Sequence, residues 1–358
     1  MRITKITAAF ATLVLVSFAL AGSAFAADQC TPFGDPPAQV NQGFFASWFS
    51  AHNPICFSGR VLGPWKDSEG SDRYACIYEP EQLSRDNPLP LVVFLHGSLA
   101  TADSIKMTGL VGEIDKADLG GKKHGFVLLA PEGRYATHQY PGADSNAMGW
   151  DNWYRQLSPS GDVTIAGTTY KENLDAAAVD HFIQDEIATG EVDPTRIYLT
   201  GWSNGAAMAL LYALNRQSIA AAAVYSAPDP FEAFNDPCPQ TPVPRAPTSN
   251  AEVQIFNPHI ALMHVRNSCD IGGICPNGNT FALQMRSIGV TLDDVILDPD
   301  GKPVTACDDT CGTSPMGAGD ISASGSWRGL LHHVRWPSAS NPQIFEFMKQ
   351  HPLPPAGK

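Results

Sequence analysis

The chain has 358 residues, of which 16% are charged and 44% are hydrophobic, and its 36 acidic side chains outnumber its 23 basic ones. The formal net charge of −13 at pH 7 repels phosphate backbones and argues against a nucleic-acid-binding protein. The length is sufficient for one large domain with a sizeable hydrophobic core.

The N-terminal segment has the three-part layout of a secretory signal peptide. Arg2 and Lys5 precede an uncharged apolar run, which ends in a small-residue pattern at Ala24 and Ala26. Because this run is short and interrupted by small and polar residues, a membrane anchor is the weaker alternative. We expect residues 1–26 to be removed by cleavage after Ala26. The product would be a secreted or periplasmic protein without a membrane anchor.

All eight cysteines lie after this segment. An even number of cysteines in an exported chain favours disulfides over free thiols or a zinc site. The spacings in "CDIGGIC" and "CDDTC" would also suit a metal site, but an oxidising destination makes pairing the better interpretation. We therefore predict no metal, and no organic cofactor is indicated. The cysteines are Cys30, Cys56, Cys76, Cys238, Cys269, Cys275, Cys307 and Cys311.

Residues 31–73 are rich in Pro, Gly and Asp and are expected to form an irregular cover. Apolar runs typical of buried strands then alternate with segments that have helical spacing, which predicts a mostly parallel sheet flanked by helices. Residues 134–170 are polar and aromatic, as in many functional loops. We predict one α/β domain over 27–358, with strands at 74–80, 89–97, 124–133, 196–201, 220–228 and 259–265, and helices at 101–120, 171–190, 204–215, 279–289 and 341–352.

A G-x-S-x-G motif at residues 201–205 stands between a predicted strand and an Ala-rich predicted helix. In this context the glycines permit a tight turn that holds the serine hydroxyl at a helix N-terminus, where partial positive charge favours an oxyanion. A chance Gly-Ser-Gly turn is the alternative. The strand–turn–helix context favours Ser203 as the nucleophile of an α/β-hydrolase fold.

A serine hydroxyl needs a base, and in this fold the acid and then the histidine follow the serine in chain order. Asp270 comes just after the end of a predicted strand, where reactive groups collect in open α/β sheets. Asp229, which follows the preceding strand, is the main competitor. His332 and His333 are the credible bases after Asp270, because His351 ends the last predicted helix.

An oxyanion hole requires two backbone N–H donors. One should come from Asn204, directly after the nucleophile, and the other from Ser98 or Leu99, in the loop after the strand that ends in "FLHG". We expect His96, in this strand end, to orient the loop rather than to transfer protons.

The segments "LVVFLHGSLATADS", "GWDNWY" and "VDPTRIYLTGWSNGAAMALLYAL", with the late H-x-x-W-P pattern, resemble a known family over about residues 89–350. It comprises secreted α/β-hydrolase esterases grouped with polyhydroxybutyrate depolymerases, feruloyl esterases and acetylxylan esterases. The resemblance implies Ser203 as nucleophile, Asp270 as acid, and Ser98 and Asn204 as oxyanion donors.

The tryptophan-rich loop of this family maps onto Trp150, Asn152 and Trp153, which would line the substrate pocket. Trp202, beside the nucleophile, joins this predicted substrate-binding set. Core packing is the alternative for any one of these tryptophans.

The chain departs from the family pattern at three places. Ser98 stands where the family usually has cysteine or glycine, and the motif around Asp270 is two residues longer. Val334 occupies the usual slot of the base, two positions before the late tryptophan. His333 requires a one-residue loop insertion and His332 requires two, so we predict His333 as the base.

Cys269 adjoins the predicted acid, and Cys307 and Cys311 lie in the segment that leads to the histidines. A disulfide from Cys269 to one of these two cysteines would fix the acid loop against the base loop. Cα separations of more than about 7 Å would exclude such a bond.

These observations predict a secreted serine esterase that hydrolyses carboxylic esters through a Ser-His-Asp acyl-enzyme mechanism. Its substrates would be hydroxyalkanoate oligomers or polyesters, or esters of the feruloyl or acetyl type. Two alternatives stay open. One is an amide hydrolase, such as a poly(amino acid) depolymerase with the same triad. The other is a non-catalytic protein that binds a polymer or glycan on this scaffold.

Overall fold

The computed structural model describes most of the chain between residues 54 and 354, and the structural statements below refer to these residues. The described residues are 54–68, 70, 72–98, 100–133, 150, 163–165, 168–170, 174–228, 230, 257, 259–271, 274–308 and 327–354. The predicted signal peptide, Leu99, Asn152, Trp153 and Asp229 lie outside them.

A nine-stranded sheet forms the centre of the described part of the chain. Its strand order is β1-β2-β4-β3-β7-β8-β9-β10-β11. Neighbouring strands from β4 to β10 are parallel, while antiparallel pairs occur at the two edges. The strands are β1 (Arg60–Lys66), β2 (Asp72–Tyr78), β3 (Leu89–Leu95), β4 (Val127–Pro131), β7 (Val192–Trp202), β8 (Ala221–Tyr225), β9 (Ala261–Asn267), β10 (Thr291–Leu297) and β11 (Pro303–Val304), with β5 (Val163–Ile165) and β6 (Thr168–Tyr170) in a separate pair.

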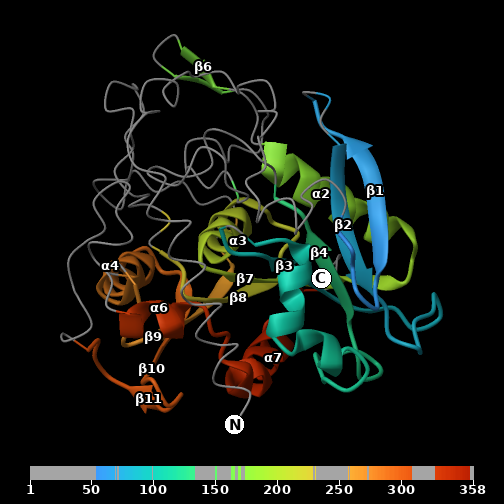
Figure 1. Ribbon diagram of the computed structural model, residues 1–358. Helices are drawn as coiled ribbons and strands as arrows, with labels where there is room; N and C mark the ends of the chain where they lie inside the picture. The colour runs from blue at the N-terminus through green and yellow to red at the C-terminus, as the bar shows by residue number, and fades with distance from the viewer. Residues whose placement is uncertain are drawn as a thin grey trace.

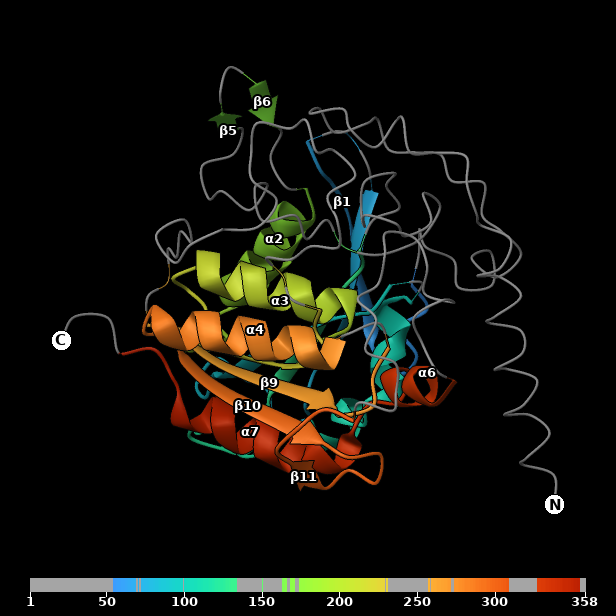
Figure 2. The ribbon, with the colours of Figure 1, turned by 90° about the vertical axis from the view of Figure 1, so that its left-hand side faces the viewer.

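Helices cover both faces of this sheet (Figure 1). The helices α2, α3 and α4 lie on one face and α7 lies on the other (Figure 2). The short helix α6 lies at the end of the sheet toward which β9 points (Figure 2). The bounds are α2 (Leu174–Ala188), α3 (Asn204–Asn215), α4 (Ile274–Ser287), α6 (Trp327–His333) and α7 (Asn341–Gln350), with the 3-10 helices η2 (Ala102–Met107), η3 (Leu110–Glu113) and η7 (Ser338–Ser340).

Side chains of the central strands alternate between two hydrophobic cores. On β3, Leu91 and Val93 pack with the apolar side chains of α2, α3 and α4, whereas Val92 and Phe94 pack with those of η2 and α7. Every residue of β3 is buried, because a parallel strand with helices on both sides has no solvent-facing surface. The parallel sheet, its two helical layers and the strand–turn–helix from β7 to α3 together confirm the predicted α/β-hydrolase fold.

The structure corrects several predicted elements. The segment 101–120 does not form one helix but two 3-10 helices, η2 and η3, because Gly109 between them has a φ of 79°, in the left-handed region. The predicted irregular cover 31–73 contains β1, and β10, β11 and α6 were not predicted. The other predicted strands and helices are present with shifted ends.

Two disulfides are described in full, Cys56–Cys76 and Cys275–Cys307. Cys307 is therefore not the partner of Cys269, and that version of the acid-loop hypothesis is wrong. Cys269 is disulfide-bonded, but its partner lies outside the described residues. The Cys275–Cys307 bond joins the start of α4, just after the acid loop, to the segment that follows β11.

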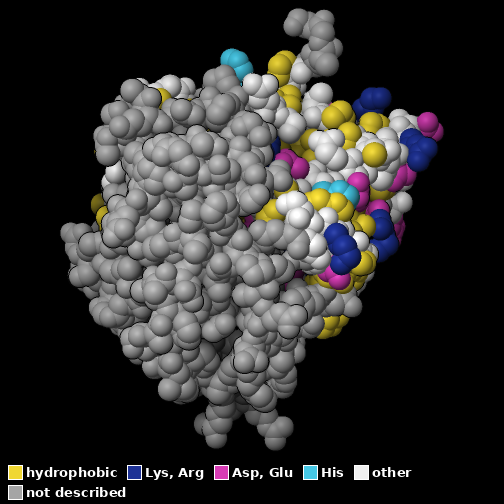
Figure 3. All heavy atoms as spheres, turned by 90° about the horizontal axis from the view of Figure 1, so that it is seen from above, with side chains coloured by type: hydrophobic (Ala, Val, Ile, Leu, Met, Phe, Trp, Pro, Cys, Tyr) yellow, Lys and Arg dark blue, Asp and Glu magenta, His cyan; other side chains and the backbone are white. Residues whose placement is uncertain are grey.

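None of the helices within the described ranges combines the length and apolarity needed to cross a lipid bilayer. On the face seen in Figure 3, the described surface carries acidic, basic and hydrophobic side chains interspersed with one another. This part of the surface therefore presents no large patch of a single charge sign.

His264, on β9, is fully buried, and neither ring nitrogen has a hydrogen-bond partner within the described residues. Burial, assisted by the nearby Arg266 charge, lowers the pKa of His264 to about 4. The unfolded chain binds a proton below about pH 6.5 that the folded chain rejects. The free energy of unfolding therefore falls as the pH drops from about 6.5 to about 4.

We expect His264→Leu to remove this pH-dependent loss of stability. The loss amounts to about 3 kcal/mol of unfolding free energy at the acidic end of the range, near pH 4. Urea denaturation at a series of pH values would measure it. Met263→Leu, at the neighbouring buried position of β9, provides a matched control, because it changes no titratable group and should leave the slope of stability against pH unchanged. Equal slopes in wild type and His264→Leu would contradict the expectation.

Candidate active site

The turn between β7 and α3 holds Ser203 in a strained conformation, with φ of 56° and ψ of −121°. Both motif glycines are required by close backbone approaches. A Cβ on Gly201 would lie 2.6 Å from the carbonyl oxygen of Gly205, and a Cβ on Gly205 would overlap the carbonyl groups of Leu95 and His96. Glycine at position 205 therefore lets the elbow pack directly against the end of β3, and glycine at position 201 lets the strand approach the start of α3.

Ser203, Asp270 and His333 lie together at the carboxyl ends of the parallel strands. His333 Nε2 is 2.8 Å from Ser203 Oγ, and His333 Nδ1 is 2.8 Å from Asp270 Oδ1. An ionised carboxylate can only accept, so the Nδ1–H donates to Asp270 and Nε2 is left to accept the proton of the serine hydroxyl. This is the arrangement in which imidazole acts as a general base toward serine.

The acid is buried and its carboxylate is fully engaged. Asp270 is 4% exposed. Besides His333, its Oδ1 accepts the backbone N–H of Ile271 at 2.7 Å, and its Oδ2 accepts the hydroxyl of Ser226 at 2.5 Å. These contacts define the plane of the carboxylate relative to the imidazole.

Two aromatic side chains hold the last carbonyl groups of α6, which carries the histidine pair. The indole N–H of Trp202 donates to the carbonyl oxygen of His333 at 2.7 Å, and the Tyr225 hydroxyl donates to that of His332 at 2.8 Å. Burial raises the pKa of the Tyr225 phenol, so the hydroxyl stays protonated and remains a donor. Trp202 and Tyr225 also pack edge-on against Trp336, which follows the helix.

His332 does not contact Ser203 or Asp270 through any described hydrogen bond, and its ring is only partly buried. Partial burial and the neighbouring Arg328 charge lower the pKa of His332. Of the two neighbours, His333 is the one that lies between the serine and the acid.

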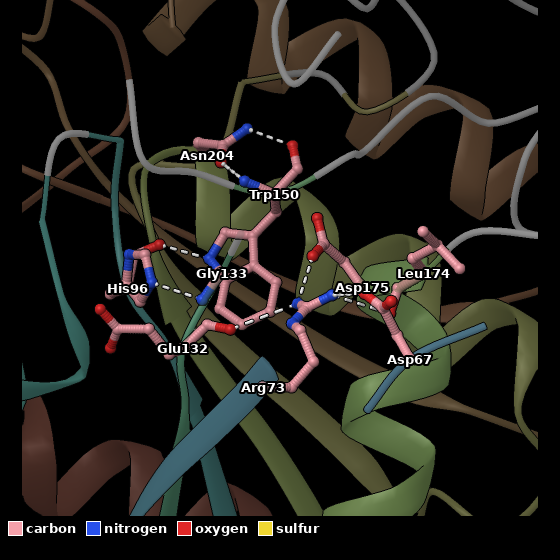
Figure 4. A network of polar contacts seen from close by, with 9 residues as sticks. All are labelled: Asp67, Arg73, His96, Glu132, Gly133, Trp150, Leu174, Asp175 and Asn204. Atoms are coloured by element: carbon pink, nitrogen blue, oxygen red, sulfur yellow. Dashed lines mark hydrogen bonds and ion pairs between the residues drawn. The ribbon is translucent and has the colours of Figure 1, made fainter. Parts of the chain in front are cut away.

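The loop after β3 is anchored from two sides (Figure 4). His96 Nε2 accepts the backbone N–H of Gly133 at 2.9 Å, so its Nδ1 carries the proton and faces the carbonyl oxygen of Gly97 at 2.9 Å. Burial lowers the pKa of His96 to about 4, which keeps this imidazole neutral. Glu132 accepts the N–H of Ala102 at 2.6 Å, and burial raises the pKa of this carboxyl well above its usual range.

A buried arginine lies beneath this loop (Figure 4). Arg73, on β2, is 2% exposed and forms an ion pair with Asp175 of α2 at 2.5 Å. The same guanidinium donates to Asp67 Oδ2 at 3.4 Å, to the Leu174 carbonyl at 3.2 Å and to the Glu132 carbonyl at 3.3 Å. The network joins the edge of the sheet, the start of α2 and the segment after β4.

Of the two residues predicted to donate to an oxyanion, Asn204 lies at the elbow and Ser98 follows a residue that borders it. Asn204 is the first residue of α3, and its side chain is turned away to bond the backbone of Trp150, accepting its N–H at 2.7 Å. Gly97, which precedes the partly exposed Ser98, approaches Ser203 so closely that a Cβ on it would lie 3.4 Å from the serine Cβ. The backbone of both segments thus borders the nucleophile.

The predicted substrate-binding residues have different surroundings. Trp150 is fully buried, packs in the core with α2 and α3, and donates its indole N–H to the carbonyl of His96 at 2.8 Å. Trp202 is 7% exposed and supports α6. Asn152 and Trp153 lie outside the described residues. A contact of any of these four with substrate stays a prediction.

Sequence reasoning missed Tyr225, Ser226, Arg73 and Glu132. A signal existed for the first two, because they end the strand that follows the elbow, where polar side chains of parallel strands gather. No local pattern marks Arg73, since its ion-pair partner Asp175 lies 102 positions away in the chain.

Comparison with known proteins gives one family. Residues 73–233 match the family described as esterase PHB depolymerase. The poly(3-hydroxyalkanoate) depolymerase C of Paucimonas lemoignei is 28% identical over 143 residues, which cover 40% of this chain and 28% of that protein. The chain thus matches less than a third of the length of this relative. The findings support the predicted resemblance to depolymerase-like carboxylic ester hydrolases.

The solved structures that match this chain include two esterases. Est2 from Thermogutta terrifontis, a Planctomycetes species, has a TM-score of 0.47 and 15% identity, covering 85% of this chain and 97% of that one. A thermostable esterase has the same TM-score and identity and covers 83% of this chain and 64% of its own.

Proposed function

From the region that resembles the esterase PHB depolymerases, we propose that this chain is an exported serine esterase that hydrolyses carboxylic esters through an acyl-enzyme. The observation that carries the proposal is the continuous chain from Ser203 Oγ through the His333 ring to Asp270, with 2.8 Å at each step. The strained turn that presents the serine gives further support.

In the proposed mechanism, Ser203 attacks the ester carbonyl while His333 Nε2 accepts the hydroxyl proton. His333 then gives this proton to the leaving alcohol, and afterwards activates the water that releases the acid from the serine. Asp270 keeps the imidazole in the required tautomer and stabilises its charged form.

The tetrahedral intermediate carries a negative charge on the former carbonyl oxygen. We assign its stabilisation to the backbone N–H groups of Ser98 and Asn204, of which the second also lies at the positive end of the α3 dipole. In enzymes of this type, one such donor contributes about 3 kcal/mol to the transition state.

The proposed substrates are hydroxyalkanoate oligomers or polyester chains, a choice favoured over feruloyl and acetyl esters by the name of the Paucimonas relative. The described disulfides accord with export, and we propose a mature chain of one catalytic domain, residues 27–358, after removal of residues 1–26. This mechanism uses no metal or organic cofactor.

Labelling with a fluorophosphonate probe tests this function directly, because the hydroxyl of an activated serine attacks the phosphorus of the probe, displaces fluoride and forms a stable phosphonate ester. We expect the wild-type chain to be labelled at one serine and Ser203→Ala to be unlabelled. Ser287→Ala, at an exposed serine of α4, is the matched control and should be labelled like wild type. An unlabelled wild type would overturn the esterase proposal in favour of a polymer- or glycan-binding protein.

Release of product from hydroxyalkanoate trimers, compared with matched amides, then distinguishes the ester from the amide reaction. Hydrolysis of the amide alone would point to the poly(amino acid) depolymerase alternative.

A further inference from the structure

Ser226 is a buried serine with an unusual backbone conformation directly after β8. It is 0% exposed, and its φ of 53° lies in the left-handed region, which a residue with a Cβ adopts only when its surroundings fix it. Its N–H donates to the carbonyl of Val265 on β9 at 2.8 Å, so the backbone is tied to the strand that leads to the acid.

The conformation directs the hydroxyl to the acid. Ser226 Oγ lies 2.5 Å from Asp270 Oδ2, and a carboxylate can only accept this bond, so the hydroxyl donates. The other oxygen, Oδ1, receives both His333 Nδ1 and the N–H of Ile271. Within the described residues, Ser226 donates to Oδ2, and this bond opposes rotation of the carboxylate about its Cβ–Cγ bond.

The preceding residue, Tyr225, contacts the other half of the same site. Its hydroxyl donates to the carbonyl of His332, and its own carbonyl accepts the N–H of Ser203 at 3.1 Å. Tyr225 and Ser226, at the end of β8, therefore contact the segments that carry the nucleophile, the base and the acid.

We propose that Ser226 is a positioning residue for catalysis, which acts through Asp270 by fixing the carboxylate in the plane that the His333 imidazole requires. This inference rests on the proposed esterase function. A carboxylate free to rotate would still be charged, but it would hold the imidazole less well in the orientation that accepts the serine proton.

The test is steady-state hydrolysis of an activated aryl ester by Ser226→Ala. Alanine keeps a Cβ, so the backbone strain stays nearly unchanged and the hydroxyl alone is lost. We expect kcat to fall about 10- to 100-fold, as for loss of a hydrogen bond to a charged group, with KM changed by less than about threefold. Thr200→Val is the matched control, because it also removes a buried hydroxyl. The Thr200 hydroxyl, on β7, has no hydrogen-bond partner within the described part of the chain.

A double-mutant cycle with Asp270→Ala separates positioning from a general loss of structure. If Ser226 acts through the acid, the substitution Ser226→Ala lowers kcat in the wild type but has no further effect when Asp270 is already alanine. An equal loss in both backgrounds, or a wild-type kcat in Ser226→Ala, would overturn the inference.

Ser226→Gly covers the case in which the alanine variant folds poorly. Glycine adopts this backbone conformation without strain, so the variant should be more stable than Ser226→Ala and should still lose kcat. Failure of this inference differs from failure of the esterase proposal. In the first case the wild type reacts with the fluorophosphonate probe and Ser226→Ala is fully active, and in the second the wild type itself does not react.

Discussion

His333→Ala is expected to lower kcat for an activated ester by about ten thousand- to a millionfold, the loss seen when the base of a serine triad is removed. The reason is that Ser203 Oγ has its 2.8 Å contact with His333 Nε2 and keeps its proton without it. His332→Ala should retain kcat within about threefold, because the contact that His332 makes to Tyr225 uses its backbone carbonyl, which alanine preserves.

Stopped-flow or steady-state release of 4-nitrophenol would measure both variants, with thermal unfolding as the control for folding. The comparison of the two variants is specific, because His332 and His333 are adjacent in the chain and carry the same side chain. High activity in His333→Ala together with loss in His332→Ala would show that the base had been assigned to the wrong neighbour.

Arg73→Met is expected to reduce the free energy of unfolding by about 3–5 kcal/mol. Methionine fills much of the space of the arginine stem, but it leaves the buried carboxylate of Asp175 without the guanidinium that lies 2.5 Å away. Removing one member of a buried ion pair is far more costly than the pair itself was favourable. The carbonyl of Glu132 also loses a donor, which should loosen the loop after β3.

Arg60→Met, on the neighbouring strand β1, is the matched control. Arg60 pairs with Glu79 at 2.8 Å, but its side chain is 56% exposed, and pairs of this kind contribute at most about 1 kcal/mol. Urea denaturation of both variants gives the two values on one scale. Similar losses of unfolding free energy in the two variants would show that the buried Arg73 network stabilises the fold no more than an exposed ion pair does.

Sequence predicts best those strands and helices whose residues all have similar surroundings. Strands such as β3 are buried on both faces and therefore consist of consecutive apolar residues. The edge strand β1 was missed because, among the described strands, it pairs with β2 alone and is largely exposed, so its residues show no apolar run. The segment 101–120 has helical spacing, but Gly109 in a left-handed conformation interrupts it.

The residues of the candidate site also differ in how well the sequence predicts them. Ser203 was predictable because its turn is a local steric problem, solved by glycines two positions before and two after it. Asp270 and His333 could be chosen only by chain order and family spacing, since they lie 63 positions apart. The contacts of Ser226 and Arg73 were not predictable, because each depends on which strands the topology brings together.

The way in which α6 is held has an evolutionary consequence. Its last two carbonyl groups are bound by Tyr225 and Trp202, which belong to β8 and β7, so the sheet itself supplies the reference points for His333. The number of residues between β11 and this helix is then under little selection from the catalytic geometry, because lengthening a connection costs little once its end is anchored. We expect insertions and deletions in relatives to accumulate in that interval, while the aromatic pair at the strand ends changes together with the histidine helix.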